Sequence, residues 1–450
     1  MACLPLCCYT TGIKNAFSNT DALESSTLTP QSSILSKSKT NKDENTTMKI
    51  LHIDETFHPN FGYQCNPLAK FQSKAGHEVY IIAPEAKFIY PSYHKFGEYG
   101  ETLDKDDRVY EQATGVRIVR VPGIRYIAGR LIYNKKALYR AIEKIDPEVM
   151  LVHCVETVTA MRVMRKYHKK YPMAFDSHML SMATKNKFHK LYEFAYKALI
   201  TSFIKKKQYK VIKTQNDDYI TSHLGVPEKQ TRFISFGTDT VLFAPDSEVR
   251  TAFLREHGLP EKTFVITSTG KLSEEKDGKL FAKGVREKFK GDRPVAVVVV
   301  ACFGGNYEKE VKAMLDQSEN HVFYYPIQKY LDLPKFYQIA DVTVFPKQCS
   351  MSFYDAQSCA CPVISEKGRV NEDRNSHGNG LCFERGSSED FRRQIQTLID
   401  LPEEEYKQMQ ANSLEFITKN YSYDQIAQRY TDVLVEAIDN FNKKRKRKQA

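Results

Sequence analysis

Residues 341–383 read DVTVFPKQCSMSFYDAQSCACPVISEKGRVNEDRNSHGNGLCF, and this stretch decides how the rest of the chain is interpreted. The apolar segment Val342–Phe345 predicts a strand that stops at Pro346, and Pro362–Ile364 predicts a second strand after a helix-like run that contains Asp355. In such a strand–loop–helix–strand unit, backbone N–H groups at the start of the helix attract an anion, and a carboxylate one turn in can hold a ribose hydroxyl. The unit therefore predicts a site for a phosphorylated ligand.

Length and composition describe an ordinary globular protein of two or three domains. The chain has 450 residues, of which 41% are hydrophobic and 27% are charged. The longest apolar run, Val295–Phe303, is far shorter than the ~20 residues that span a bilayer, so we expect no transmembrane helix. The ten cysteines form no CxxC pair, which argues against a metal site and favours a reducing compartment.

The positive charge is concentrated in two places. The tail Lys443–Lys448 carries six of the net +11 charges and leaves 11 − 6 = +5 for the rest, so we expect no nucleic-acid partner. Such a tail is a solvated end, a contact for anionic lipid or a nuclear import signal. Residues 185–210 place apolar side chains and lysines at helical spacing, which predicts either a helix packed on a sheet or a surface that meets anionic lipid headgroups.

The chain divides into segments of different character. Residues 1–47 contain 19 Ser, Thr or Asn residues and no hydrophobic period, so we predict a disordered extension and a functional start at Met48. Regular alternation of strand and helix patterns predicts a first domain at 48–226 and a second at 227–421. We predict that 422–442 forms a helix returning to the first domain and that 443–450 is a basic tail.

A series of short motifs follows in a fixed order along these two domains. In that order and spacing, the sequence resembles the family 4 retaining glycosyltransferases of the GT-B fold, from Met48 to about Ile438. The resemblance implies an α/β architecture in which two Rossmann-like, doubly wound domains face each other across a cleft. The motifs are Met48–Leu51 with Gly62, Gly76–Val79, Phe236-Gly237-Thr238-Asp239-x3-Phe243-x-Pro245, Gly270-Lys271-x4-Lys276, Asp355-Ala356-x4-Cys361-Pro362-Val363-Ile364, and Asn379-Gly380.

The resemblance implies three catalytic residues. Lys271 and Lys276 match the basic pair that neutralises the departing diphosphate, although the first is usually an arginine, and lysine lacks the two-pronged guanidinium. His178 matches the histidine that points at the donor sugar from a strand end. We expect no metal and no cofactor, because the nucleoside diphosphate sugar is a substrate and the lysines carry the charge.

The remaining donor-binding residues also come from the resemblance. Gly62 matches a loop that approaches the diphosphate, and Gly270 precedes the basic pair. Asp355 stands in for the ribose-binding acid of the family's Glu-x7-Glu signature, whereas Lys347 occupies the place of the acid that contacts the sugar. The loop residues Ser350, Met351 and Ser352 replace a glycine-rich turn.

We therefore expect a hexosyltransferase-like enzyme that moves a sugar from a nucleoside diphosphate to a glycan or lipid-linked acceptor hydroxyl with retention, in polysaccharide or glycolipid synthesis. Its expected place is the cytoplasm, with peripheral contact to an anionic membrane surface. Two alternatives remain: a sugar-nucleotide epimerase, against which the junction motif and the lysine pair speak, and a non-catalytic GT-B binding or scaffold protein, which Lys347 favours.

Overall fold

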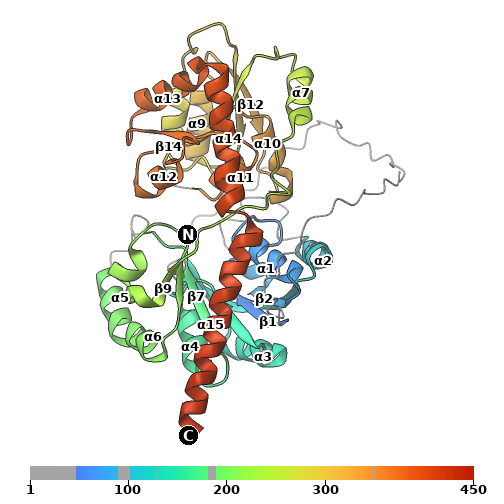
Figure 1. The fold of residues 1–450 in the computed structure, drawn as a ribbon. Helices are drawn as coiled ribbons and strands as arrows, with labels where there is room; N and C mark the ends of the chain where they lie inside the picture. Colours follow the sequence, from blue (N-terminus) through green and yellow to red (C-terminus); the bar gives the residue numbers. More distant parts are fainter. Residues whose placement is uncertain (1–46, 90–101, 128, 181–188, 348–349, 450) are drawn as a thin grey trace, which may run out of the picture. The chain divides into compact units, whose positions relative to one another are not determined.

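The computed structural model describes residues 47–89, 102–127, 129–180, 189–347 and 350–449. The predicted extension, except for Thr47, therefore lies outside the described residues, as do the start of the amphipathic run 185–210 and the loop residues Gln348 and Cys349. The described part of the chain forms two domains of alternating strands and helices (Figure 1).

The first domain is built on a parallel sheet of seven strands in the order β3-β2-β1-β6-β7-β8-β9. Successive strands connect through helices, as parallel pairing requires. The strands are β1 Lys49–Ile53, β2 Glu78–Pro84, β3 Arg117–Val121, β6 Val149–Val152, β7 Met173–Ser177, β8 Val211–Lys213 and β9 Thr231–Phe233. The helices are α1 Cys65–Lys74, α2 Leu103–Thr114, α3 Lys135–Ile145, α4 Val158–Tyr167, α5 His189–Tyr196 and α6 Ser202–Lys207, and β4 Gly123–Ile127 forms a hairpin with β5 Arg130–Tyr133.

The second domain is built on a parallel sheet of six strands in the order β12-β11-β10-β13-β14-β15. Its strand β11 is buried along its whole length, as its run of valines predicts. The strands are β10 Phe264–Thr269, β11 Val295–Val300, β12 His321–Tyr325, β13 Val342–Phe345, β14 Val363–Glu366 and β15 Gly380–Phe383. The helices are α7 Ser247–Glu256, α8 Gly278–Gly284, α9 Asn306–Leu315, α10 Pro334–Gln338, α11 Ser352–Ser358, α12 Arg369–Arg374, α13 Ser388–Asp400 and α14 Glu403–Asn420.

Both sheets reverse their strand order once. The reversal lies between β1 and β6 in the first domain and between β10 and β13 in the second. Chains leave two neighbouring strands there in opposite directions, so a crevice opens at the carboxyl ends of the strands, where ligands bind in doubly wound sheets. The fold thus places one candidate site in each domain before any side chain is considered.

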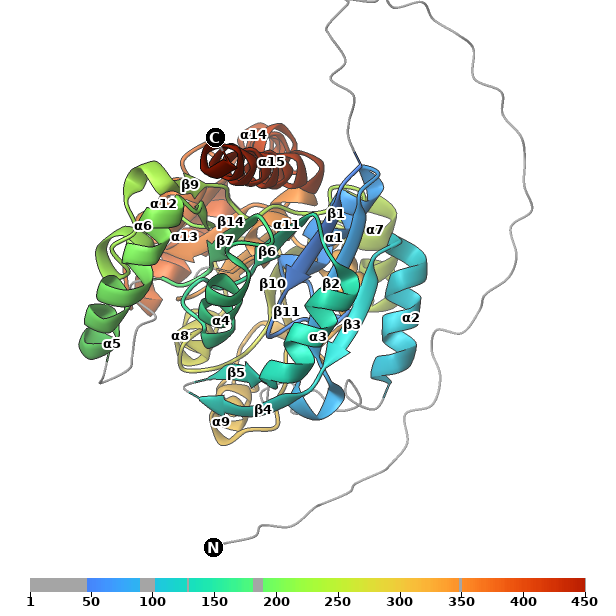
Figure 2. The same cartoon turned by 90° about the horizontal axis from the view of Figure 1, so that it is seen from below.

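The last helix, α15 Tyr423–Gln449, packs on the first sheet rather than on the second (Figures 1 and 2). Its buried residues Ile426, Tyr430 and Leu434 share one apolar cluster with Leu68 of α1 and with strand residues of β1, β6, β7 and β8. The opposite face of the sheet is covered by α3, α4 and the segment from α5 to α6. The apolar stripe of α15 therefore completes the core of the first domain.

Two predicted boundaries are wrong. Strand β9 pairs with β8 of the first sheet, so the second domain does not begin at residue 227. The exposed Arg232 and Phe233 are typical of an edge strand, and no residue in the segment indicates which of the two sheets takes it. The segment 443–450 is not a separate tail either, because α15 continues through it to Gln449.

No helix within the described residues combines the length and the apolarity that crossing a bilayer requires. The prediction that the chain contains no transmembrane helix is thus confirmed for that part of the chain.

Candidate active site

A hollow of about 90 Å³ lies at the carboxyl edge of the second sheet, at the reversal between β10 and β13. Five residues predicted to bind the donor line it: Gly270, Lys271, Lys276, Ser350 and Ser352. They come from the loop after β10, the approach to α8, and the segment between β13 and α11. The structure therefore brings together side chains that are up to 82 positions apart in the sequence, as the resemblance implies (352 − 270 = 82).

The backbone of the first loop depends on a glycine. Gly270 has φ = +112°, a conformation that residues with a Cβ rarely adopt, and no heavy atom lies within 4 Å of where its Cβ would be. Any other residue at position 270 would strain the backbone, although there is room for its side chain. The turn carries the chain from β10 into the lysine-bearing loop.

The second loop is held by an arginine that the sequence did not suggest as important. Arg374 of α12 is 4% exposed and donates a hydrogen bond of 2.8 Å from its guanidinium to the Ser350 carbonyl. Its guanidinium carbon also lies 4.8 Å from the centre of the Tyr354 ring. The Ser350 hydroxyl accepts a hydrogen bond of 3.3 Å from the Ser352 backbone N–H. This wall of the hollow is thus fixed by a buried cation.

Asp355 and Met351 do not line the hollow. The Asp355 carboxylate accepts a hydrogen bond of 2.6 Å from the Thr238 hydroxyl and is 5% exposed. Burial raises its pKa to about 7, and the nearby Asp239 carboxyl adds to the rise. Met351 instead packs against an apolar cluster that includes Phe353. In this structure the Asp355 side chain therefore binds the Phe236–Asp239 segment and does not face the hollow.

Lys347 lies at the end of β13, where the resemblance would place an acid. Its ammonium group is 3.8 Å from the Asp277 carboxylate and donates a hydrogen bond of 3.5 Å to the Glu274 carbonyl. Asp277 directly follows Lys276. Because Lys347 contacts Asp277, it lies at the same loop as Lys271 and Lys276. The side chain of Lys347 stays 43% exposed.

Gly62 lies against the second domain. A Cβ built on it would be 2.0 Å from an atom of the Tyr330 ring, and the Tyr330 N–H donates a hydrogen bond of 3.1 Å to the Asn60 carbonyl. The absence of a side chain is therefore required by the Tyr330 ring. The resemblance assigned this glycine to the diphosphate, and no motif in the sequence indicated the aromatic neighbour.

The carboxyl edge of the first sheet holds a group of polar side chains beside His178. The His178 Nε2 atom is 3.3 Å from an oxygen of Asp176 on β7, and its ring stacks on Phe236 at 5.4 Å between centres. The other Asp176 oxygen is 2.7 Å from Nδ1 of His153, which follows β6. His153 in turn contacts His52 of β1. The resemblance predicted His178 near the donor sugar, but no motif in the sequence indicated His52.

Burial and mutual contact set the charges in this group. Burial by itself would raise the pKa of Asp176, yet the pKa lies well below its ordinary value because His153 and His178 stabilise the carboxylate. Burial likewise opposes the charged form of His153, but Asp176 raises the pKa of that imidazole well above its usual range. The pKa of His52 is lowered to about 3, first by burial and then by His153.

The comparison with known proteins identifies the second domain. Residues 249–416 match the family model described as glycosyl transferases group 1. This part of the chain is therefore similar to the group 1 glycosyltransferases. The match spans the second sheet and contains Lys271, Lys276 and Asp355, so the recognised family is confirmed at the level of group 1.

Solved structures of glycosyltransferases share the fold of the whole chain at low identity. A glycosyltransferase from Rickettsia africae is 15% identical, with a TM-score of 0.65, over 88% of this chain and 99% of its own. HepE from Anabaena, solved in complex with UDP and glucose, is 16% identical, with a TM-score of 0.63, over 86% and 100% of the two chains. Sucrose-phosphate synthase from Thermosynechococcus elongatus is 14% identical, with a TM-score of 0.63, over 86% and 98%. The predicted GT-B fold is confirmed.

A search of curated proteins finds no significant match. The glycosyltransferase domain supports the coarser part of the predicted function, transfer of a sugar from a nucleotide sugar. The retaining stereochemistry, the hexosyl donor, the acceptor and the membrane contact stay predictions.

Proposed function

We propose that the chain transfers a hexose from a nucleoside diphosphate sugar to a hydroxyl group of a glycan or lipid-linked acceptor, with retention at the anomeric carbon. The observation that carries this proposal is the hollow at the reversal of the second sheet, with Lys271 and Lys276 in its wall. A site with two cationic side chains at this edge suits a diphosphate. The solved complex of HepE with UDP and glucose, on the same fold, adds support.

The proposed reaction requires the protein mainly to stabilise the charge on the leaving diphosphate. The bond between the anomeric carbon and the diphosphate oxygen breaks, a bond from the acceptor oxygen to that carbon forms, and the acceptor proton leaves with the diphosphate. Negative charge grows on the leaving group, and in this proposal Lys271 and Lys276, which line the hollow, stabilise that charge. In the proposed reaction these lysines supply the positive charge, so no metal ion is needed.

The test is a donor panel with the purified full-length chain. UDP-, GDP- and ADP-linked sugars, including UDP-glucuronate because of Lys347, are incubated with simple glycan and lipid acceptors. We expect release of a nucleoside diphosphate that depends on the acceptor and a product whose anomeric NMR signals match the donor configuration. Inversion would exclude retention, epimerised donor without release would indicate an epimerase, and no turnover of any donor would favour a scaffold.

A basic groove favours a membrane-bound acceptor. A hollow of about 750 Å³ lies between the end of α4, the end of α6 and the end of α15. Apolar residues such as Met173 and Phe441 also line it. We propose that anionic lipid headgroups occupy this groove, because their charge complements its lining. The basic lining residues are Lys169, Lys170, Lys206, Lys207, Lys210, Lys444, Arg445 and Arg447.

Exposed apolar side chains on α5 fit the same role. Leu191 and Phe194 are 68% and 73% exposed, respectively, although large apolar groups normally avoid water. They belong to the run 185–210, whose described part also supplies the lysines at the end of α6. This combination of lysines and exposed apolar groups is typical of surfaces that meet the interface of an anionic bilayer.

A further inference from the structure

A continuous path of polar contacts leads from α1 through the first sheet to His178. The Gln72 side-chain oxygen is 2.7 Å from Nε2 of His52, and Nδ1 of His52 is 3.0 Å from Nε2 of His153. The path continues from His153 to Asp176 at 2.7 Å and from Asp176 to His178 at 3.3 Å. All members except His178 are buried, so water cannot replace the contacts among the buried members.

The direction of each hydrogen bond can be worked out from the Asp176 end. An ionised carboxylate only accepts hydrogen bonds. His153 therefore donates from Nδ1, and His178 donates from Nε2. One Asp176 oxygen also accepts a hydrogen bond of 3.0 Å from the Cys154 backbone N–H. The Asp176 carboxylate thus has three donors around it, and the backbone N–H among them fixes it in place.

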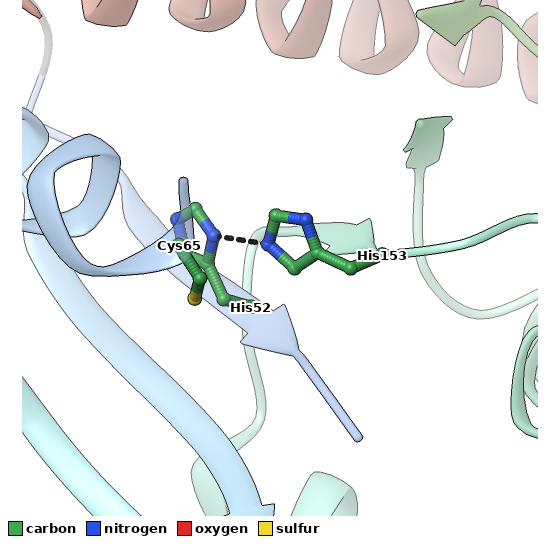
Figure 3. Close-up of side chains that lie close together, drawn as sticks. All are labelled: His52, Cys65 and His153. Carbon is green, nitrogen blue, oxygen red and sulfur yellow. Dashed lines mark hydrogen bonds between the residues drawn. The ribbon is translucent and has the colours of Figure 1, made fainter. Parts of the chain in front are cut away.

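The two central histidines face each other through ring nitrogens, as Figure 3 shows. The amide oxygen of Gln72 accepts, so His52 donates from Nε2 and its Nδ1 carries a lone pair when the ring is neutral. The facing Nε2 of His153 must then carry a hydrogen. His153 consequently holds protons on both nitrogens and is an imidazolium ion paired with Asp176. The opposite pKa directions of His52 and His153 agree with this arrangement.

We propose that Asp176 is a positioning residue that holds His178 in the tautomer with a hydrogen on Nε2, so that Nδ1 accepts a hydrogen bond from a hydroxyl of the donor sugar. This inference rests on the proposed function. The charge of Asp176 is already balanced by His153, and the carboxylate orients His178 through the contact with Nε2. The Phe236 ring, stacked within 15° of parallel, restricts rotation of the imidazole.

The first test reads the protons directly. Full-length protein labelled with 15N-histidine is observed by long-range 1H–15N NMR at pH 7.5, and the signals are assigned by single histidine substitutions. We expect His153 as an imidazolium and His178 as the neutral Nε2–H tautomer. In Asp176→Asn, His153 should become neutral and His178 should lose its tautomer preference. A His178 protonated at Nδ1 in the unmodified protein would overturn the proposal.

The second test compares two amides at position 178, with the donor that the panel identifies. The side-chain amide of Asn reaches the position of Nδ1, whereas that of Gln reaches the position of Nε2. We expect His178→Asn to keep kcat within ~10-fold and His178→Gln to lose on the order of 10²-fold, the usual size of an oriented proton contact. The exposed His321 on β12, substituted by Asn, serves as the control. The reverse order of the two variants would contradict the inference.

The positioning role predicts a particular kinetic pattern. Asp176→Asn should lower kcat ~10-fold or more and leave the KM for the donor within ~3-fold, because orientation matters more as charge develops. Because that variant leaves a buried imidazolium without its partner and can fail to fold, His153→Gln/Asp176→Asn removes both charges together and should show the same loss. Unchanged kcat in the folded double variant would overturn the proposal.

A metal ion between the histidines is the main competing explanation. His52, Cys65 and His153 offer ligand atoms within 4.8 Å of one another (Figure 3). Metal analysis should find less than one tenth of an equivalent of zinc in protein purified without chelator. One equivalent of zinc that is lost in Cys65→Ser would overturn the proton assignment. The NMR test remains decisive if no donor is turned over, so failure of the proposed function is distinguishable from failure of this inference.

Discussion

At the scale of single residues, Asp355 is a carboxyl group whose surroundings disfavour its charge. Its pKa is about 7 in the folded chain and about 3.8 when exposed, so the folded state holds the proton more tightly. Below pH ~4 both states are protonated, and between pH ~4 and 7 only the unfolded state releases the proton. Ionisation of Asp355 therefore lowers the stability of the fold progressively as the pH rises through this window.

Asp355→Asn should remove this penalty. The amide can still accept the hydrogen bond from Thr238, so the free energy of unfolding at pH 8 should rise by about 2 to 4 kcal/mol, with little gain at pH 4. Denaturant unfolding at both pH values measures the difference, and the exposed Asp332→Asn is the control. An equal gain at both pH values would rule out the titration. A loss of UDP affinity in the same variant would support the ribose role.

Lys276 is the side chain on which the proposed leaving-group chemistry depends most. Lys276→Ala should lower kcat/KM on the order of 10²-fold or more, because a cation aimed at developing charge contributes several kcal/mol. The matched control is Lys283→Ala, which removes an exposed lysine from α8, outside the hollow. Steady-state kinetics with the identified donor measure the effect. Full activity in Lys276→Ala would remove this residue from the mechanism.

At the scale of elements, α15 joins the core of the first domain to the basic groove. Its apolar stripe packs on the sheet up to Leu434, and its last turns carry Lys444, Arg445 and Arg447 into the groove. The Lys444 ammonium group donates a hydrogen bond to the Lys207 carbonyl at the end of α6. One helix thus fixes basic residues that a free tail would leave mobile.

Removal of residues 443–450 should weaken binding to vesicles that contain anionic lipid. About 1 kcal/mol is expected for each lysine or arginine near such a surface, so the loss should exceed 10-fold and should vanish on neutral vesicles. Sedimentation with vesicles of 30% phosphatidylserine measures it, and Lys206→Glu/Lys207→Glu should give a similar loss. Equal binding by the truncated and complete chains would show that the groove does not meet lipid.

The positions of individual strands were easier to predict from the sequence than the sheet that each strand joins. The strand β13, predicted at Val342–Phe345, has those bounds in the structure, because a doubly buried strand is a continuous run of apolar and β-branched residues. Strand β9 was assigned to the wrong sheet, since three half-exposed residues carry no signal of their neighbours. In the site, Gly270, Lys271 and Lys276 were predicted from the resemblance to family 4 glycosyltransferases. Arg374 and Tyr330 were missed, because their roles arise from contacts between residues distant in sequence.

At the scale of the whole chain, a few contacts connect the two Rossmann-like domains. Lys70 pairs with the buried Asp239 at 2.5 Å, and Arg369 pairs with Asp218 at 2.8 Å. The Tyr330 ring covers Gly62. Because α15 follows the second domain and packs on the first, the chain also crosses between the domains near Tyr421, whose carbonyl accepts a hydrogen bond from the Thr238 N–H.

The contact between Gly62 and Tyr330 makes the most direct prediction about this connection. The backbone of Gly62 is not in the left-handed region, so Gly62→Ala is disfavoured by crowding alone, with its Cβ 2.0 Å from the Tyr330 ring. Overpacking of this kind costs about 1 to 3 kcal/mol. In a Tyr330→Ala background the same substitution should cost almost nothing, because the ring is absent, so the double-mutant cycle should give a coupling of at least ~1 kcal/mol.

Denaturant unfolding of the four proteins measures that coupling, and kcat/KM with the identified donor shows whether it matters for turnover. Gly304→Ala is the control, because its Cβ would meet only the Cys302 sulfur at an ordinary 3.8 Å. Additive effects of the two substitutions would mean that the loop and the ring are not in contact in solution. A coupled loss of both stability and kcat/KM would place this contact in the form of the enzyme that carries out the transfer.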